Sequence, residues 1–195
     1  MAGKKNKRPG RREHLNDFRA ELNGEYIYEG AYYVPLSGSL ADFCKKTRIL
    51  TAIAVLLGFC PGFIIGVPDA NGLHLMLPWI AQLITAVTLI SSAMKLKAED
   101  KGLRGYRYRK SVEVYPVRLL TLAIFAAVEL VCAAVHIFTS GGGPLAPLLL
   151  ALVSALCAAC ALYLRKRIMS LGWKKSESRT NSFARRGLRF IKAFQ

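Results

Sequence analysis

One acidic side chain lies in the middle of a long apolar stretch of the chain. Glu129 follows Arg118 by eleven residues, which corresponds to about 16 Å along a helix at the usual rise per residue. It would therefore sit near the middle of a hydrocarbon core about 30 Å thick. Because an ionised carboxyl group is costly at that depth, we expect Glu129 to face protein or water and treat it as a candidate functional residue.

Two other apolar stretches carry groups that would reach the same depth. One of them has a polar face made of Gln82, Thr85, Thr88 and Ser92. The other contains Pro61, which lacks a backbone N–H and is expected to kink its helix and free a carbonyl group. With Glu129, these groups support two interpretations. They form a proton or cation site, or they form hydrogen bonds that merely hold helices together, which we favour.

The other reactive residues do not form a recognisable catalytic or metal site. His74, His136 and Asp69 fall on one predicted side of the membrane, but their spacing is not that of a metal motif. Cys157 and Cys160 lie among small residues in an apolar stretch, which favours helix packing over redox chemistry. The sequence also lacks a phosphate-binding loop, a nucleophile elbow and an acid pair. We therefore predict no enzyme activity, no bound metal and no cofactor.

Four apolar stretches would position these residues. They cover 49–67, 74–94, 118–138 and 145–164, and each is close to the length of about 20 residues that crosses a bilayer. The connections 68–73 and 139–144 are short, so the helices that they join should pack side by side. We predict an all-α polytopic membrane protein with four transmembrane helices arranged as two antiparallel hairpins.

Basic residues are sorted along the chain. The 195 residues are 53% hydrophobic, yet they include 28 Lys and Arg against 12 Asp and Glu, a formal net charge of +16. All 28 basic residues lie in 1–48, 95–118 and 165–195, and the two short connections contain none. By the positive-inside rule, both termini are predicted in the cytoplasm, with the chain in a bacterial cytoplasmic membrane. This explanation leaves nucleic-acid binding by the basic tail as the weaker interpretation.

The two predicted hairpins resemble each other at an offset of 70 residues. The matching pairs are Arg48 and Arg118, Thr51 and Thr121, Leu75 and Leu145, and Lys95 and Arg165. Apolar helices also resemble one another through composition alone, so duplication and chance similarity both stay open. Because both copies begin on the same side, a duplication would be a parallel repeat.

Four segments are predicted in the cytoplasm: a basic tail (1–24), a Tyr-rich segment (25–47), a basic loop (95–117) and a basic C-terminal tail (165–195). In the second, residues 26–28 and 31–34 flank Glu29 and Gly30, which predicts a small β-hairpin. Residues 106–115 repeat the aromatic pattern around Lys110 and Ser111. Since an isolated hairpin is marginal in water, the two segments either pair with each other or form an aromatic belt at the bilayer surface. We favour the belt.

The C-terminal tail predicts an amphipathic helix from residue 183 onward. Spacings of three and four residues group Phe183, Phe190, Ile191 and Phe194 on one face, opposite Arg185, Arg186, Arg189 and Lys192. A basic helix with such an apolar face binds at a membrane surface. We expect it to bind the lipid bilayer through anionic head groups, and a groove on a partner protein is the alternative.

These features favour a small integral membrane protein that acts as an interaction, accessory or assembly subunit. The predicted outer connections are too short for a receptor, and the cytoplasmic segments hold most of the polar sequence. We therefore expect a protein partner on the cytoplasmic face. The alternative is a small proton- or cation-coupled transporter or channel component, working as a homo-oligomer, that uses Glu129 and the Pro61 break.

Overall fold

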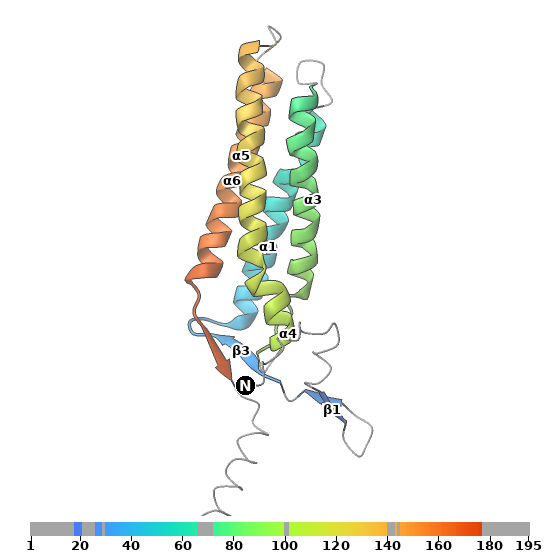
Figure 1. Cartoon of the computed structure of the whole chain (residues 1–195). Coiled ribbons are helices and arrows are strands. Elements are labelled where there is room, and N and C mark those ends of the chain that lie inside the picture. Colours follow the sequence, from blue (N-terminus) through green and yellow to red (C-terminus); the bar gives the residue numbers. More distant parts are fainter. Residues whose placement is uncertain are drawn as a thin grey trace, which may run out of the picture.

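The chain forms a bundle of long helices with small β-sheets at one end, called here the sheet end; the opposite end is the loop end (Figure 1). This computed structural model describes residues 18–20, 26–28, 30–65, 72–99, 102–139, 143 and 145–176. Several predicted features lie outside the described residues. They are the basic tail up to residue 17, Asp69, and the amphipathic helix with Phe183, Arg185, Arg186, Arg189, Phe190, Ile191, Lys192 and Phe194.

Four helical segments in the described part of the chain are long and apolar enough to cross a membrane. Their main helices are α1 (Leu40–Phe59), α3 (Leu73–Lys95), α5 (Tyr115–Thr139) and α6 (Leu145–Ser170). Helix α1 begins nine residues before the apolar stretch that starts at residue 49, and α6 continues six residues beyond residue 164. These additional turns lie at the sheet end of the apolar span and carry basic residues, Lys45, Lys46 and Arg48 on α1 and Arg165, Lys166 and Arg167 on α6. The four helices indicate a multi-pass membrane protein.

The first of these segments is interrupted near its loop end. Helix α1 ends at Phe59, and a short helix, α2 (Pro61–Ile65), follows after Cys60. Since Pro61 has no N–H to donate, the regular ladder of backbone bonds stops there. The N–H of Phe63 instead donates to the carbonyl of Cys60 at 3.1 Å. This tighter turn lets α2 continue from the end of α1.

Small side chains allow the helices to approach one another closely. Helix α5 packs against α3 and α6, and α1 packs against the same two helices. Ala54, Ala86, Ala126 and Ala161, one from each of the four main helices, are completely buried in the core. Large side chains such as Phe63, Val131 and Phe138 point outward and are exposed. In a bilayer this arrangement provides close helix contacts inside and an apolar surface toward lipid.

Two antiparallel sheets form at the sheet end. Strands β1 (Phe18–Ala20) and β2 (Tyr26–Tyr28) pair with each other. A second sheet has the order β4-β3-β5, from β3 (Tyr32–Pro35), β4 (Leu103–Arg104) and β5 (Trp173–Ser176). Tyr32 pairs with both Arg104 and Ser176. The second sheet therefore joins three segments that are far apart in the chain, and the predicted all-α architecture did not include it.

The expected hairpin over 25–34 is wrong in its pairing. The residues expected to form its two strands are extended, but β2 pairs with β1, and β3 pairs with β4 and β5. The ring of Tyr28 folds over Gly30, where an added Cβ would lie 2.4 Å from the ring. The N–H of Gly105 donates to the Tyr28 hydroxyl at 3.0 Å. The position of the Tyr28 ring and the four-residue pairing with β5 favour this arrangement over a two-residue turn.

The strand-like pattern expected over 106–115 is also wrong. After β4 the chain forms α4 (Gly105–Tyr108) and a π-helical segment, η3 (Arg109–Glu113), before α5 begins at Tyr115. The Ser111 hydroxyl donates to the carbonyl of Arg107 at 2.5 Å within this helical stretch. Adding turns to a formed helix is much easier than starting one, so the aromatic segment joins α5 as helix.

Candidate functional site

Glu129 is paired with a residue of the neighbouring helix in the bundle interior. It projects from α5 and is fully buried, as is Ser154 on α6. The Ser154 Oγ lies 3.0 Å from the Glu129 Oε2 and 2.9 Å from the carbonyl oxygen of Leu150. Neither helix exposes the pair to the surrounding medium. The arrangement joins α5 to α6 by a buried polar contact in the apolar core.

A second set of buried polar contacts joins α1, α3 and α6. The Gln82 Nε2 on α3 lies 3.7 Å from the Cys157 Sγ on α6. The Cys157 thiol in turn donates to the carbonyl oxygen of Ala54 on α1 at 3.6 Å. Gly58 on α1 packs beside this amide, and a Cβ there would lie at ordinary contact distance, 3.6 Å, from the Gln82 Nε2. Together the two contacts place polar groups from α1, α3, α5 and α6 in one interior.

The predicted polar face of α3 does not converge on Glu129. The Thr85 hydroxyl donates to the Ala81 carbonyl at 2.9 Å, and the Thr88 hydroxyl donates to the Thr85 carbonyl at 2.8 Å. Both threonines therefore satisfy their hydroxyl groups within their own helix. Pro61 is buried at the start of α2. Of the five candidate residues, Glu129 and Gln82 are those whose side chains form hydrogen bonds to another helix.

Two oxygen atoms in this interior have no hydrogen-bond partner among the described residues. They are the Glu129 Oε1 and the Gln82 Oε1, and both are buried. A buried acceptor without a partner is costly. Each of these two oxygen atoms could still accept a hydrogen bond.

Ser154 was missed as the partner of Glu129, although the sequence contained a usable signal. Ser154 precedes Arg165 by eleven residues, which is the separation between Arg118 and Glu129. Measured from basic residues at the same end of the bundle, the two side chains therefore have equal depth. Which face of α6 turns toward α5 could not be derived from this spacing.

Two histidines meet at the loop end. The His74 Nε2 on α3 lies 3.2 Å from the His136 Nδ1 on α5, with ring centroids 5.1 Å apart. His136 is buried and His74 is exposed. Within the part of the chain that the structure describes, no group of three or more His, Cys, Asp or Glu is arranged to hold a metal ion. The third group considered from the sequence, Asp69, lies outside that part.

Two arginines reach the sheet-end half of α3. The Arg118 Nη1 on α5 donates to the Thr88 carbonyl oxygen at 2.6 Å and also to the Ser92 hydroxyl. Arg48 on α1 donates to the carbonyl of Leu96, directly after α3. Of these acceptors, the Leu96 carbonyl lies at the C-terminus of α3, where carbonyl groups lack partners in their own helix and carry partial negative charge. The two side chains therefore connect α1 and α5 to α3 at this end.

Aromatic rings attach the three-stranded sheet to the bundle. Tyr33 of β3 stacks on Tyr108 of α4 with centroids 4.0 Å apart. Trp173 of β5 meets Tyr108 edge-on at 5.2 Å and Phe43 of α1 at 5.4 Å. Such ring pairs add to the free energy gained from burial alone. We use the term sheet layer for β3, β4, β5 and α4, which these contacts hold against α1.

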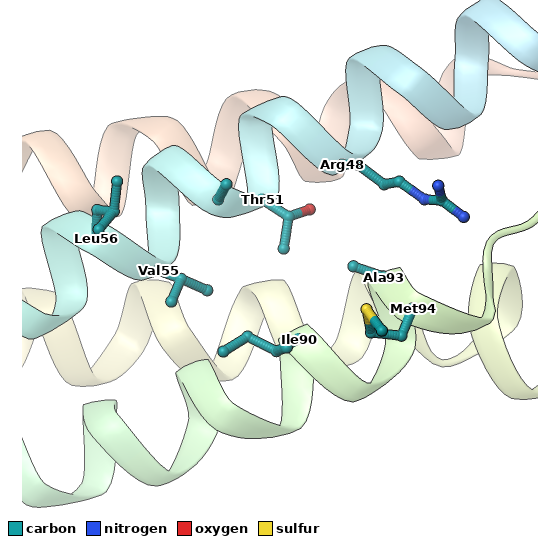
Figure 2. Close-up of a pocket in the computed structure, with 8 residues that line it drawn as sticks. Arg48, Thr51, Val55, Leu56, Ile90, Ala93 and Met94 are labelled. Atoms are coloured by element: carbon teal, nitrogen blue, oxygen red, sulfur yellow. The ribbon is translucent and has the colours of Figure 1, made fainter.

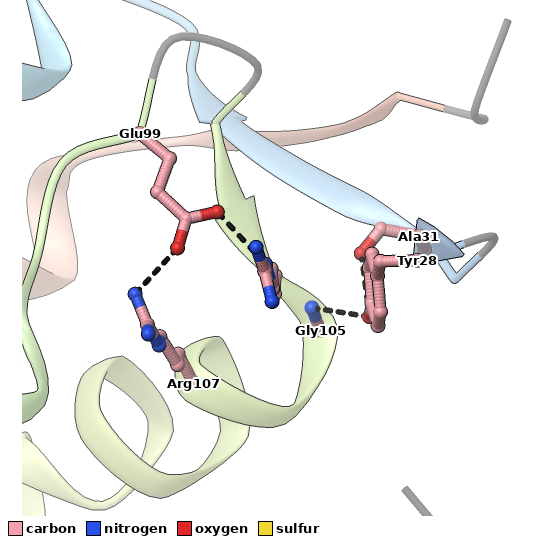
Figure 3. Close-up of polar contacts among 6 residues, drawn as sticks. Tyr28, Ala31, Glu99, Gly105 and Arg107 are labelled. Carbon is pink, nitrogen blue, oxygen red and sulfur yellow. Dashed lines mark hydrogen bonds and ion pairs between the residues drawn. The ribbon is translucent and has the colours of Figure 1, made fainter. Parts of the chain in front are cut away.

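A polar network beside the sheet layer fixes the loop that follows α3. The two carboxylate oxygens of Glu99 accept bonds from the Arg104 Nε at 2.8 Å and the Arg107 Nη1 at 2.6 Å (Figure 3). Arg104 also lies over the rings of Tyr28 and Phe18, 5.5 and 5.9 Å from their centroids. The network joins the loop, α4 and the first sheet.

Comparisons of the chain with known protein families, curated proteins and solved structures found no match.

Proposed function

We propose that this protein is an integral membrane accessory or assembly subunit that binds a protein partner through the sheet layer. The observation that carries the proposal is that three distant chain segments, 32–35, 103–104 and 173–176, fold together as one layer at one end of the bundle. A mere connection between membrane helices has no need for such a layer. A defined surface outside the apolar span is what a partner would recognise.

The charge at the sheet end supports both the orientation and the chemistry of the partner. The lysines and arginines of the described part lie at this end, on the sheets, on the loop after α3 or on the adjoining helix turns. The positive-inside rule therefore favours a cytoplasmic sheet layer. Lys174 and Lys175 are exposed on β5, an edge strand of its sheet. Lysines on an edge strand discourage pairing with another strand, so we expect recognition by acidic side chains of the partner.

A photo-crosslinking experiment in cells tests the proposal. A photoreactive amino acid replaces Lys174 in the sheet layer or, as the control, Phe138 at the loop end, where the side chain is highly exposed. We expect one defined protein adduct from position 174 and none of that mass from position 138. The paired change Lys174→Glu and Lys175→Glu should reduce recovery of that partner several-fold, because it reverses two charges at the surface. Lys166→Glu, at an exposed site on α6, is the matched control.

Equal adducts from positions 138 and 174, or no adduct from either, would contradict an interaction through the sheet layer. A partner retained equally by Lys166→Glu and the double variant would contradict recognition by charge. Both results are distinct from loss of folding, which the elution profile of the purified variants reports.

A second candidate is a proton- or cation-coupled transporter or channel component, acting as a homo-oligomer. It is favoured by the buried oxygens of Glu129 and Gln82 that lack partners and by the helix break at Pro61. Proteoliposome flux of the wild type and Glu129→Gln is the test. The substitution keeps the size of the side chain and removes its ability to ionise. Flux that survives the change would remove the carboxyl group from the mechanism.

A further inference from the structure

A groove opens between α1 and α3 in the half of the bundle near the sheet end. Its volume is about 490 Å³, within the range of about 300 to 1,000 Å³ that holds one small ligand. The walls are apolar, with Val55 and Leu56 on α1 facing Ile90 and Met94 on α3 (Figure 2). Glu129 does not line it, so the groove is separate from the buried polar interior.

The groove is open on its outer side, and two of the residues that line it are small. Ala52 on α1 and Ala93 on α3 line the hollow, where larger side chains would fill it. Leu56 and Met94 at its rim are 65% and 76% exposed. If α1 and α3 cross a membrane, this opening faces the lipid. An apolar chain from the bilayer would enter it without crossing a polar barrier.

The sheet-end limit of the groove is polar and basic. Arg48 lines it and directly precedes the apolar stretch of α1. One terminal nitrogen of Arg48 donates to the Leu96 carbonyl, which holds the guanidinium group across the gap between the two helices. An arginine has five N–H donors, so others stay available for an anion. Lys45 and Lys95 are exposed on the neighbouring turns and increase the positive potential.

The length of the groove matches one leaflet of a bilayer. From Arg48 to Leu56 the helix advances eight residues, or about 12 Å. Half of a hydrocarbon core about 30 Å thick is close to that length. The groove has a cation at its boundary and an apolar trough below it. This order complements a phospholipid, which has an anionic phosphate followed by apolar acyl chains.

We propose that this groove binds one anionic phospholipid, with its phosphate at Arg48 and an acyl chain along Ala52, Leu56 and Ile90. Arginine suits a phosphate because its planar fork offers two parallel hydrogen bonds. The adjoining lysines select an anionic head group over a zwitterionic one. The site lies outside the sheet layer, and its occupancy does not depend on a protein partner.

The test uses the full chain in phosphatidylcholine nanodiscs that contain a minor fraction of phosphatidylglycerol with a photoreactive acyl chain. Phosphatidylcholine with the same photoreactive chain is the comparison lipid. We expect wild-type adducts of phosphatidylglycerol to map to 52–56 and 90–94, in excess over phosphatidylcholine. Arg48→Gln should lower the phosphatidylglycerol yield about fivefold, the loss expected when one cation near an anionic head group is removed. Arg48→Lys should be intermediate, because the charge stays and the fork is lost.

Blocking the trough tests the acyl-chain half of the site. Ala52→Phe fills the groove and should reduce labelling by both lipids, whereas Ala159→Phe, at an exposed position on α6, should not. Lys166→Gln, also on α6, is the control for loss of a positive charge. Equal labelling of 52–56 and 90–94 by the two lipids in the wild type would overturn the proposal. The same conclusion would follow if Lys166→Gln reduced the yield as much as Arg48→Gln, or Ala159→Phe as much as Ala52→Phe.

Discussion

The hydroxyl group of Ser154 has two acceptors within reach but only one proton to donate. Its Oγ lies within hydrogen-bond distance of both the Leu150 carbonyl and the Glu129 Oε2. The hydroxyl proton can be shared between the two acceptors, or a protonated Glu129 can donate to Ser154 while Ser154 donates to Leu150. A neutral carboxyl group also avoids the cost of a buried charge. This arrangement explains how an acidic residue can stabilise the contact between α5 and α6.

Removal of the Ser154 hydroxyl should weaken this contact. We expect Ser154→Ala to lower the free energy of unfolding by about 1 to 2 kcal/mol, because a buried polar group loses its partner. Ser170→Ala is the matched control, since Ser170 is exposed and bonds only to the Arg167 carbonyl of its own helix. Reversible unfolding in mixed detergent measures both. Equal values for the two variants would show that the bond to Glu129 does not stabilise the fold.

The two threonines related by the 70-residue offset have different environments. The Thr51 Oγ1 lies 2.6 Å from the hydroxyl of Tyr115, which is fully buried. Thr121 bonds to the Val117 carbonyl of its own helix. We expect Thr51→Val to cost about 1 kcal/mol of unfolding free energy and Thr121→Val less than about 0.5 kcal/mol. Similar costs measured by the same unfolding assay would contradict a specific role for the Tyr115 bond.

At the scale of elements, the sheet layer depends on a tight approach between the loop after α3 and β3. Gly102 has a φ of +113°, a conformation that side chains rarely allow. A Cβ at this position would lie 2.9 Å from the Val34 Cγ2 and 3.0 Å from the Tyr33 carbonyl oxygen. The backbone of β3 cannot move away without losing its pairing with β5. The close pairing of β4 with β3 therefore requires glycine at 102.

Gly102→Ala should loosen the sheet layer while the helices stay intact. We expect a local cost of about 1 to 3 kcal/mol from backbone strain, with steric contact added. Gly38→Ala is the control, because Gly38 also has a positive φ of 81° but nothing lies within 4 Å of an added Cβ. Hydrogen exchange of the amides in 32–35 and 173–176 measures the effect. We expect faster exchange in Gly102→Ala only. Equally fast exchange in both variants would mean that the positive φ, and not the close approach to β3, causes the loss of protection.

At the scale of the whole molecule, the three-stranded sheet constrains the threading of the chain. Segments 32–35, 103–104 and 173–176 share one sheet, so they must lie on the same side of any membrane that the helices cross. Two spans separate each segment from the next. This requirement is independent of the positive-inside rule. The distribution of basic residues and the pairing of the three strands support the same threading.

Cysteine labelling from one side of a membrane checks this threading. In a chain whose native cysteines are replaced by alanine, Lys97→Cys and Lys175→Cys should react with an impermeant reagent from the same side. Gly143→Cys, at the loop end, should react from the opposite side. We expect the first two to be labelled from the cytoplasm. Labelling of positions 97 and 175 from opposite sides would contradict both the sheet and the charge argument.

The possible origin of the bundle by duplication stays a prediction. The bundle order, in which α1 and α5 each lie between α3 and α6, fits such a repeat. Yet Leu75 is fully buried, whereas its match Leu145 is 73% exposed. Arg48 and Arg118 both contact the α3 region, although strict symmetry would direct one of them to α6.

Sequence reasoning was most successful for features set by length, composition and local charge. The four apolar stretches predicted four helices long enough to cross a membrane, because a bilayer demands internally bonded segments of that length. The break near Pro61 also followed from a local cause, the missing N–H. The burial of Glu129 was expected from its depth, since an exposed carboxyl group would face hydrocarbon. These properties depend on single segments and the solvent around them.

Tertiary structure alone decided which groups meet. Helix rotation turned Ser154 toward Glu129 and left Thr85 and Thr88 bonded to their own helix. Strand partners for 26–28 and 32–35 came from other parts of the chain, since a short strand takes the register that its ring contacts and neighbours stabilise. The groove between α1 and α3 is lined by residues of both helices, so it depends on how the two helices pack together. The depth of a residue in the membrane follows from counting residues along one helix. The contacts of its side chain depend on the rotation and packing of several helices together.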